Sequence, residues 1–368
     1  MEQKTDLSVI FTFSASEVEN PYFNLLYNAL RKKGIRVIEG DRPILFPLTR
    51  NVITNKDSDI LHLDWIYGFY MTDGLTDLKP IDDLLTCVRA VFFLLDMLII
   101  SLLPTAVVWT VHNKHHHERK YPRVERVVNE LAFLVVDGIS VKCENARRVL
   151  KNEYLTAKSE KMYVAPDGNY ISAYQNEVST NDARTELGIG DDKFVFLFFG
   201  LIREYKGVPE LISAFQDVVK PDMELWIVGN PTSNEYQSEL EMSLQSTPNT
   251  YTRFGFIESE NVQHYMNAAD VLVLPYRSIL NSGSVHLGLS FGMPIITPQI
   301  GCIPEVVPPE NTFLYDPDGS NALRNALINS YNCSNLEKIS EANYQQSLEQ
   351  NWSKTAGETV KMYKSVTS

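Results

Sequence analysis

Short apolar runs alternate with helix-like segments along the first half of the chain. One such segment, residues 21–34, opens at a proline and ends in Lys32, Lys33 and Gly34, the charges and the terminator common at helix C-termini. The apolar runs are short and continuous, as in strands that are buried on both faces. They lie at residues 7–13, 35–39, 59–65, 106–111 and 135–141. This alternation predicts a parallel sheet covered by helices on both faces.

The same alternation starts again after Pro166. Residues 167–192 are polar and rich in turn-forming residues, which predicts a linker with one short helix. The strands predicted beyond it are residues 194–199, 224–228, 251–254, 270–275, 294–297 and 312–315. We therefore predict an α/β protein of two doubly wound, Rossmann-like domains that face a cleft, residues 1–167 and 168–351. Residues 352–368 are expected to form a helix that crosses back to the first domain.

Residues 90–109 form a stretch that is apolar enough to resemble a membrane span. Asp96 lies within it and Pro104 interrupts it, so a buried helix that leads into a buried strand is favoured. The first residues of the sequence lack the basic start and apolar core of a secretory signal. The four cysteines form no CxxC pair, which argues against a zinc ribbon and fits a reducing compartment. We expect a cytoplasmic protein.

The charge of the chain limits the classes of partner. The 368 residues include 33 Lys and Arg against 46 Asp and Glu, which gives a formal net charge of −13. Nucleic acid is therefore not expected as the main partner, because binding along phosphates needs a positive surface. A hydrophobic share of 44% is enough for packed cores, and the length fits two domains with a site between them.

The most informative stretch follows the predicted strand at residues 194–199. The strand ends in Gly200, and Arg203 and Lys206 follow in the loop before the next predicted helix. Ligands of open α/β sheets bind beyond the carboxyl ends of the strands, and two cations at that place suit a diphosphate. The alternative interpretation is that both are solvated loop cations.

A second stretch suited to anions is Asn-Ser-Gly-Ser at residues 281–284, before a short predicted helix. Small polar residues at a helix N-terminus leave backbone N–H groups and hydroxyl groups available to an anion. Read alone, Ser282 and Ser284 are explained equally well as N-caps. Two such elements at strand ends in one domain favour a phosphate site.

The second half of the chain resembles the family-4, group 1 glycosyltransferases of the GT-B fold, which move a sugar from a nucleoside diphosphate to an acceptor. The matching pieces stand in the family's order and span most of that half. They are Gly200, Arg203, Lys206 with Gly207, and residues 228–230, 254–256, 269–276, 292–294 and 301–307. The first half matches more loosely, at residues 59–65 and 109–113.

The resemblance implies a role for each matched residue. Arg203 and Lys206 would clamp the donor diphosphate, and His112 would reach the reacting centre; these three are the candidate catalytic residues. The backbone at residues 254–257 would lie against the nucleobase. The donor-binding candidates are Gly200, Arg203, Lys206, Gly229, Phe254, Phe256, Ser282, Gly283, Ser284 and Glu305. The acceptor-binding candidates are Asp64, Trp65, Asn113 and His116, and the alternative for Asp64 is a polar strand cap.

Two features depart from the family pattern. Many members carry two glutamates eight positions apart, where this chain has Ile279 and Leu287, which cannot accept a hydrogen bond from a sugar. The small polar residues at 281–284 instead resemble a variant subgroup, so the donor sugar stays open. Leu201 stands where many members have a phosphate-binding arginine, and we assign that task to Arg203.

The resemblance also implies a reaction without a cofactor or a metal, because cations and helix dipoles neutralise the leaving diphosphate. Retention of the anomeric configuration is expected, with no dedicated base. Residues 115–117 are adjacent histidines that point in different directions, which suits an acceptor loop or a solvated loop better than a metal site. The other functions open at this point are a GT-B epimerase and a non-catalytic subunit that binds sugar nucleotides.

The expected partners are a nucleotide-sugar donor and a glycan or lipid-linked acceptor, in polysaccharide or glycoconjugate synthesis. Apolar residues 92–103 and a basic cluster also predict peripheral contact with anionic lipid at the inner face of the cell membrane. The cluster comprises Lys114, Arg119, Lys120, Arg123 and Arg126.

Overall fold

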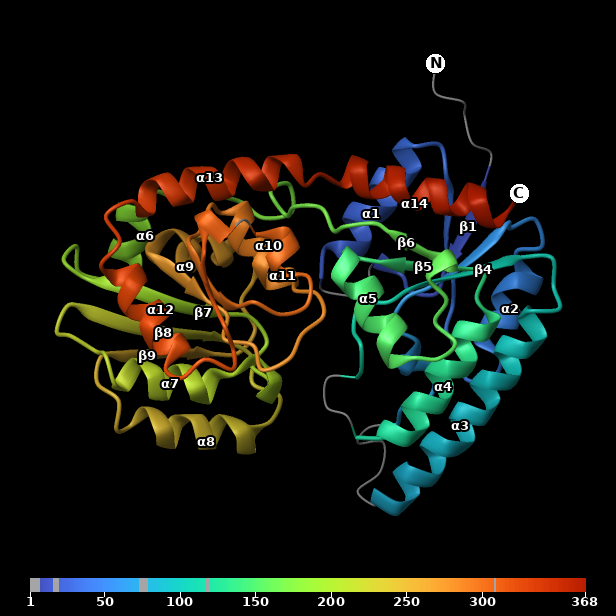
Figure 1. The fold of residues 1–368 in the computed structure, drawn as a ribbon, viewed down its shortest axis with the longest axis horizontal. Helices are drawn as coiled ribbons and strands as arrows, with labels where there is room; N and C mark the ends of the chain where they lie inside the picture. The colour runs from blue at the N-terminus through green and yellow to red at the C-terminus, as the bar shows by residue number, and fades with distance from the viewer. Residues whose placement is uncertain (1–6, 16–19, 73–78, 117–119, 308) are drawn as a thin grey trace. The chain divides into compact units, whose positions relative to one another are not determined.

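The computed structural model describes every residue except 1–6, 16–19, 73–78, 117–119 and 308 (Figure 1). The chain divides into two compact units, each built on a parallel six-stranded sheet. The first unit comprises residues 1–167 and 352–368, and the second comprises residues 168–351. The predicted class, α/β with two Rossmann-like sheets, is confirmed.

The sheet of the first unit has the strand order β2-β1-β3-β4-β5-β6. Its strands are β1 Ser8–Phe11, β2 Arg36–Glu39, β3 Ile60–Leu63, β4 Ala106–Thr110, β5 Gly138–Val141 and β6 Met162–Val164. Its helices are α1 Tyr22–Lys32, α2 Pro47–Thr54, α3 Lys79–Ile100, α4 Pro122–Val135, α5 Glu144–Glu153 and α14 Trp352–Val366. Figure 1 shows α1 and α14 on one face of this sheet, with α2, α3 and α4 on the other.

Helix α14 packs against α1, β5 and β6 within the first unit. His62 of β3 is buried beneath it and hydrogen-bonds with the hydroxyl groups of Tyr363 from α14 and of Thr110 from β4. Burial lowers the pKa of His62 to about 4, because the charged imidazolium would lose its hydration there. The ring is therefore neutral at pH 7, and both of its nitrogens have partners.

The charge inside the apolar helix α3 has a structural explanation. Helix α2 begins after Phe46, whose side chain cannot cap it. Asp96 of α3 supplies the cap, since its carboxylate accepts hydrogen bonds from the N–H groups of Leu48 and Thr49 at 2.8 and 2.9 Å. A carboxylate at a helix N-terminus is favoured by the free N–H groups and by the helix dipole. Asp96 thus joins α2 to α3.

The sheet of the second unit has the strand order β12-β11-β10-β7-β8-β9. Its strands are β7 Phe194–Phe199, β8 Met223–Gly229, β9 Thr250–Phe254, β10 Val271–Val273, β11 Ile295–Pro298 and β12 Phe313–Tyr315. Its helices are α6 Thr180–Leu187, α7 Val208–Gln216, α8 Asn234–Leu244, α9 Val262–Ala268, α10 Gly283–Ser290, α11 Ile303–Val306, α12 Ala322–Tyr331 and α13 Leu336–Glu349. Phe196 and Phe198 on β7 and Leu225 and Ile227 on β8 are fully buried at its centre.

The predicted elements agree with the observed ones at most places and differ at the edges. Strand β7 has the predicted bounds, whereas α2, α5 and β6 were not predicted. Strand β6 gives a weak signal because it has three residues and two of them are only half-buried. Residues 90–109 form the end of α3 followed by β4, as predicted. The prediction that this helix is buried is wrong for its outer side, because Val91, Leu95 and Leu98 are exposed. Within the described part of the chain, no helix is long and apolar enough to cross a membrane.

Asp96→Ala is expected to lower the free energy of unfolding of the first unit by about 3 kcal/mol, because two buried N–H groups lose their acceptor. Urea unfolding followed by tryptophan fluorescence measures this loss. Asp57→Ala is the matched control, since the side chain of Asp57 is exposed in the same unit. A loss in D96A no larger than in D57A would contradict the capping role.

The first unit is also expected to lose stability as the pH falls from 6.5 towards 4. The pKa of His62 is lowered in the folded state, so the unfolded chain binds more protons in this window and acid favours unfolding. The expected loss is about 3 kcal/mol from this group. A pH series of urea unfolding curves measures it, and in His62→Gln the difference from the wild type should shrink as the pH falls. An unchanged difference across the window would contradict this interpretation.

Candidate active site

Three neighbouring strands of the second unit end in glycines with positive φ at one edge of the sheet. Gly200 after β7, Gly229 at the end of β8 and Gly255 after β9 have φ values of 124°, 143° and 124°. A Cβ atom on Gly229 would lie 1.8 Å from the carbonyl oxygen of Gly200, so no other residue fits there. The edge is therefore open backbone, which a ligand can approach closely.

Lys206 and Ser284 come together beside Gly200. A Cβ atom on Gly200 would lie 3.3 Å from both the Nζ atom of Lys206 and the Oγ atom of Ser284. Lys206 belongs to the loop after β7, and Ser284 to the first turn of α10. An ammonium group, a hydroxyl group and the N-terminus of a helix thus converge at one strand end, which is an arrangement suited to phosphate.

The ammonium group of Lys206 is buried. The residue is 7% exposed, and its Nζ atom lies 6.0 Å from the centre of the Phe198 ring. Among the described residues, no carboxylate forms an ion pair with it. Burial, with the nearby Arg203 as the second cause, lowers the pKa of Lys206 to about 8. A buried cation without an anion is costly unless a ligand supplies one, so the solvated-loop alternative fails for Lys206. Arg203 is half-exposed, and for it that alternative stays open.

The two serines before α10 have different surroundings. Ser282 is the N-cap of α10, because its hydroxyl oxygen accepts a hydrogen bond from the N–H of Val285, and it also bonds with the hydroxyl of Tyr276 at 2.6 Å. Ser284 instead lies beside Gly200. The N-cap interpretation therefore holds for Ser282 and leaves Ser284 as the hydroxyl closest to the proposed phosphate position. Gly283, between them, lies next to the Tyr170 hydroxyl.

The other donor-binding candidates lie around this edge. Phe254 ends β9 and is half-buried, whereas Phe256 is 51% exposed. Glu305 is exposed on α11, and the loop before α11 is tied to Leu280 by a hydrogen bond from the N–H of Cys302. Ile279 and Leu287 occupy the positions of the family glutamates, and Leu287 is buried within α10.

In the first unit, the ends of β3 and β4 bring Asp64 and His112 together. The Nε2 atom of His112 lies 2.8 Å from the Oδ1 atom of Asp64, and its ring stacks on Trp65 at 4.7 Å between centroids. Asp64 is fully buried, and its Oδ2 atom has no hydrogen-bond partner among the described residues. The indole N–H of Trp109 donates to the Asp64 carbonyl oxygen. Asp64 thus orients His112. The alternative that Asp64 is only a polar strand cap does not account for this contact.

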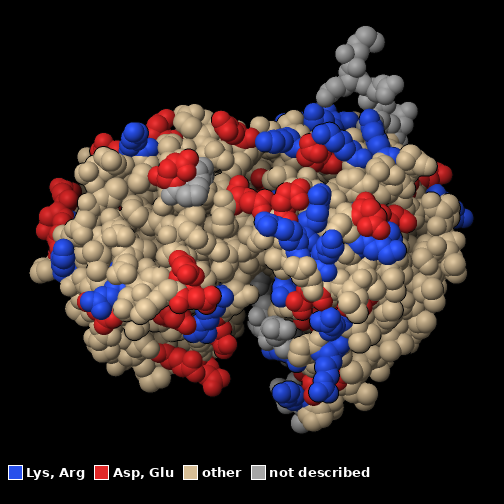
Figure 2. Space-filling view, in the orientation of Figure 1, with Lys and Arg blue, Asp and Glu red and all other residues tan. Residues whose placement is uncertain are grey.

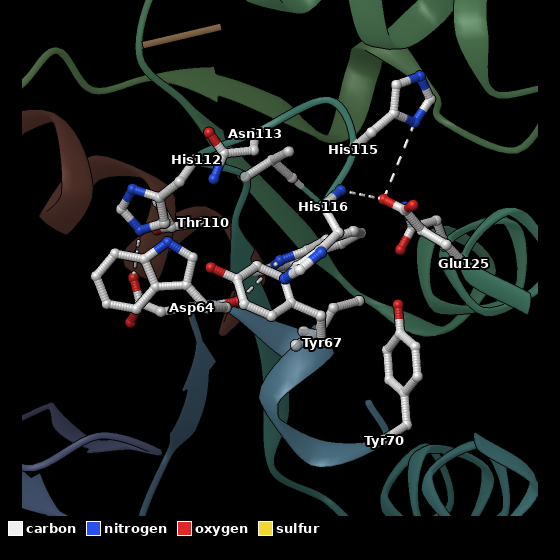
Figure 3. Close-up of a pocket in the computed structure, with 14 residues that line it drawn as sticks. Asp64, Tyr67, Tyr70, Thr110, His112, Asn113, His115, His116 and Glu125 are labelled. Atoms are coloured by element: carbon white, nitrogen blue, oxygen red, sulfur yellow. Dashed lines mark hydrogen bonds and ion pairs between the residues drawn. The ribbon is translucent and has the colours of Figure 1, made fainter. Parts of the chain in front are cut away.

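A small cavity opens at this strand edge (Figure 3). All four acceptor-binding candidates line it, together with His112. The complete lining is Asp64, Trp65, Ile66, Tyr67, Tyr70, Trp109, Thr110, Val111, His112, Asn113, His115, His116, Glu125 and Asn129. Aromatic rings beside amide, imidazole and carboxylate groups suit the apolar faces and the hydroxyl groups of a sugar.

Two residues of the histidine run, His115 and His116, line this cavity. The N–H of His116 donates to a Glu125 carboxylate oxygen, and its ring meets the edge of Tyr67 at 4.7 Å. His115 lies within 3.9 Å of Glu125 and 3.6 Å of Glu153. His117 lies outside the described residues. His115 and His116 are thus half-buried and have partners within this part of the unit.

Several cavity residues were not predicted from the sequence. Tyr67 belongs to the short helix η2, Ile66–Phe69, and Glu125 and Asn129 belong to α4, so they come from separate segments with no shared motif. Of these residues, Glu125 alone could have been singled out from the sequence, because it is a carboxylate on the buried side of an amphipathic helix.

Two residues of the predicted basic cluster, Lys114 and Arg126, form ion pairs. Lys114 contacts Glu153 at 2.6 Å, and Arg126 contacts Glu153 and Glu130. Arg119 lies outside the described residues. These pairs weaken the positive field that the cluster was expected to present to anionic lipid.

Comparisons with known proteins agree on one family. Residues 193–332 match the model of the family described as Glycosyl transferases group 1. The GDP-mannose:glycolipid 4-beta-D-mannosyltransferase of Xanthomonas campestris pv. campestris is 26% identical over 312 residues, which cover 84% of this chain and 79% of that protein.

Solved structures share the fold of the whole chain. The sucrose-phosphate synthase from Thermosynechococcus elongatus superposes with a TM-score of 0.75 at 16% identity, over 98% of both chains. Anabaena HepE in complex with UDP-glucose superposes with a TM-score of 0.71 at 15% identity, over 96% of this chain and 99% of that one. The chain is a glycosyltransferase with the GT-B fold, and its residues 193–332 match the group 1 family.

Proposed function

We propose that this enzyme transfers mannose from GDP-mannose to a glycolipid, as a step in polysaccharide or glycoconjugate synthesis at the inner face of the cell membrane. The observation that carries the proposal is the buried ammonium group of Lys206 beside Ser284, a place suited to a sugar-nucleotide diphosphate. A diphosphate is common to all such donors, so guanosine, mannose and the glycolipid are taken from the activity named for the Xanthomonas relative.

The second unit would stabilise the leaving group. When the bond between the sugar C1 and the diphosphate oxygen breaks, the electron pair stays on that oxygen. The charges of Lys206 and Arg203, with the N-terminal N–H groups of α10, would neutralise it. These groups carry the charge that a divalent ion carries in other transferases, and the proposal therefore includes no metal and no cofactor.

The first unit would bind the acceptor and take its proton. The acceptor sugar would lie in the cavity against Trp65 and Tyr67, with hydrogen bonds to Asn113 and His116. Its hydroxyl oxygen forms the new bond to C1, and the hydroxyl proton passes to the ring nitrogen of His112 that faces away from Asp64 (Figure 3). The carboxylate of Asp64, at 2.8 Å, would stabilise the resulting imidazolium.

The stereochemistry of this proposal differs from the retention expected from family resemblance. GDP-mannose holds mannose in the α configuration, and the relative's name specifies a β product, so that reaction inverts C1. Inversion requires attack from the face opposite the diphosphate, where the leaving group cannot accept the proton and a base is needed. The buried Asp64–His112 pair supports inversion with His112 as that base.

Lys206→Met is expected to lower kcat/KM for GDP-mannose by about 100-fold, because the leaving diphosphate loses a buried cation. GDP affinity gives an independent measure. In the wild type it should fall about tenfold between pH 7 and pH 9, since the pKa of Lys206 is lowered to about 8 and the ammonium is lost above it.

Calorimetry with GDP at each pH measures this fall in GDP affinity, and the fall should be absent in K206M. Lys338→Met, an exposed lysine on α13 of the same unit, is the control and should match the wild type. The same pH dependence in K206M and the wild type would overturn the diphosphate assignment.

His112→Ala is expected to lower kcat by about 100-fold or more without changing GDP affinity, because proton transfer is lost while the donor site is untouched. Transfer of labelled mannose from GDP-mannose to octyl glycosides measures the rate, and NMR of the product identifies its anomer. We expect the β anomer. His264→Ala, a histidine of the second unit paired with Glu186, is the control. An α product, or full activity in H112A, would refute inversion with His112 as base.

A further inference from the structure

Thirteen of the twenty-one large apolar side chains that are exposed in the described part of the chain lie on one group of helices. This group is α2, α3 with the turn after it, and α4; α2 packs against α3, and α3 against α4, on one face of the first unit's sheet. We call its outward side the helical face. Such a concentration on a monomer indicates a surface that another body covers.

The apolar residues of α3 form a continuous stripe. They recur every three or four residues, the spacing that places side chains on one side of a helix. The stripe is Ile81, Leu84, Val88, Val91, Leu95, Leu98 and Leu102. Leu84 is 65% exposed, Val91 58% and Leu102 79%. At 1.5 Å per residue the stripe is about 30 Å long. The surface over most of α3 is tan in Figure 2, which marks residues other than Lys, Arg, Asp and Glu.

The charged residues that are exposed on the helical face are all cations. They are Arg50 on α2, Lys79 on α3, and Arg123 and Arg126 on α4, of which Arg126 pairs with Glu153. Of the carboxylates on these helices, Asp82, Asp96 and Glu125 are buried, and Asp83 and Glu130 are half-buried. In a chain with a net charge of −13, a face with exposed cations and no exposed acids on its helices complements a negative surface.

The helical face and the acceptor cavity share their elements. Helix α4 presents Val127, Leu131 and Leu134 outward, while its inner side supplies Glu125 and Asn129 to the cavity. The short helix η2, which carries Tyr67 of the cavity, packs against α3. Helices that follow parallel strands begin at the carboxyl edge of the sheet, so α3 and α4 begin at the edge where the cavity opens.

We propose that the helical face docks on an anionic lipid bilayer, with α3 lying in the plane of the interface and its stripe in the acyl boundary. The apolar stripe and the exposed cations together are the combination that binds such a surface. Docking itself does not depend on the proposed function; only the reason for docking rests on it. A docked α3 and α4 would hold the acceptor cavity beside the membrane that contains a glycolipid. A second copy of the chain fits less well, because a symmetric contact would oppose like charges.

Sedimentation with vesicles tests the surface without donor or acceptor, so its outcome is independent of the proposed reaction. The full chain is expected to sediment with vesicles of phosphatidylcholine and phosphatidylglycerol, and less with phosphatidylcholine alone. Val91→Glu with Leu98→Glu should lower the partition coefficient by about tenfold or more, since two carboxylates enter the apolar boundary. Lys79→Glu with Arg123→Glu should remove the preference for the anionic vesicles.

Met242→Glu with Leu348→Glu is the matched control, because both residues are exposed and apolar but lie on α8 and α13 of the second unit. An unchanged unfolding midpoint and unchanged transfer to soluble octyl glycosides would show that V91E/L98E is folded. Equal vesicle binding by V91E/L98E and the wild type, or no binding by the wild type, would overturn the proposal. A wild-type dimer in light scattering that V91E/L98E converts to a monomer, without vesicle binding, would assign the helical face to a second copy.

Discussion

The contact between Gly229 and Gly200 is the constraint on which the candidate donor site depends. The α-carbon of Gly229 lies so close to the Gly200 carbonyl that any side chain there would overlap it. Both residues have φ values that glycine adopts without strain. The ends of β7 and β8 can therefore meet as bare backbone, and the space above Gly200 is left to Lys206 and Ser284. A donor phosphate needs that space, and a methyl group would fill part of it.

Two kinds of buried polar group differ in what they do for the molecule. Asp96 and His62 are buried with complete sets of partners, and they hold helices in place. Lys206 is buried with no carboxylate partner among the described residues, and keeping it charged at pH 7 costs about 3 kcal/mol relative to an exposed lysine. Groups of the first kind stabilise the fold. The second kind carries a free-energy cost that the rest of the fold offsets, and this cost falls when an anion binds. This difference separates a structural charge from a binding charge.

Much of the fold could be predicted from local pattern, because parallel strands are apolar on both faces and helices carry their own start and stop signals. Strand β7 shows this most clearly, since Phe194–Phe199 is continuous and Gly200 ends it. The candidate donor residues could also be named, because they follow strands in a fixed order. The cavity lining could not, since Tyr67 and Asn129 lie far apart in sequence and meet only through packing of η2 and α4 around the sheet edge.

The sequence by itself determined the two α/β units, the strand ends that carry Gly200 and Asp64, and the residues that suit a diphosphate. Local spacing and composition are sufficient for these features. The tertiary structure decided that Ser282 caps α10 while Ser284 lies beside Gly200, and that Lys206 is buried with no carboxylate of the described residues beside it. It also decided which side of α3 is exposed, because the buried side of that helix carries Asp82, Thr86 and Asp96 while its exposed side is an apolar stripe, the reverse of the usual amphipathic pattern. Burial is a property of what packs against a residue, and that is set by elements distant in the sequence.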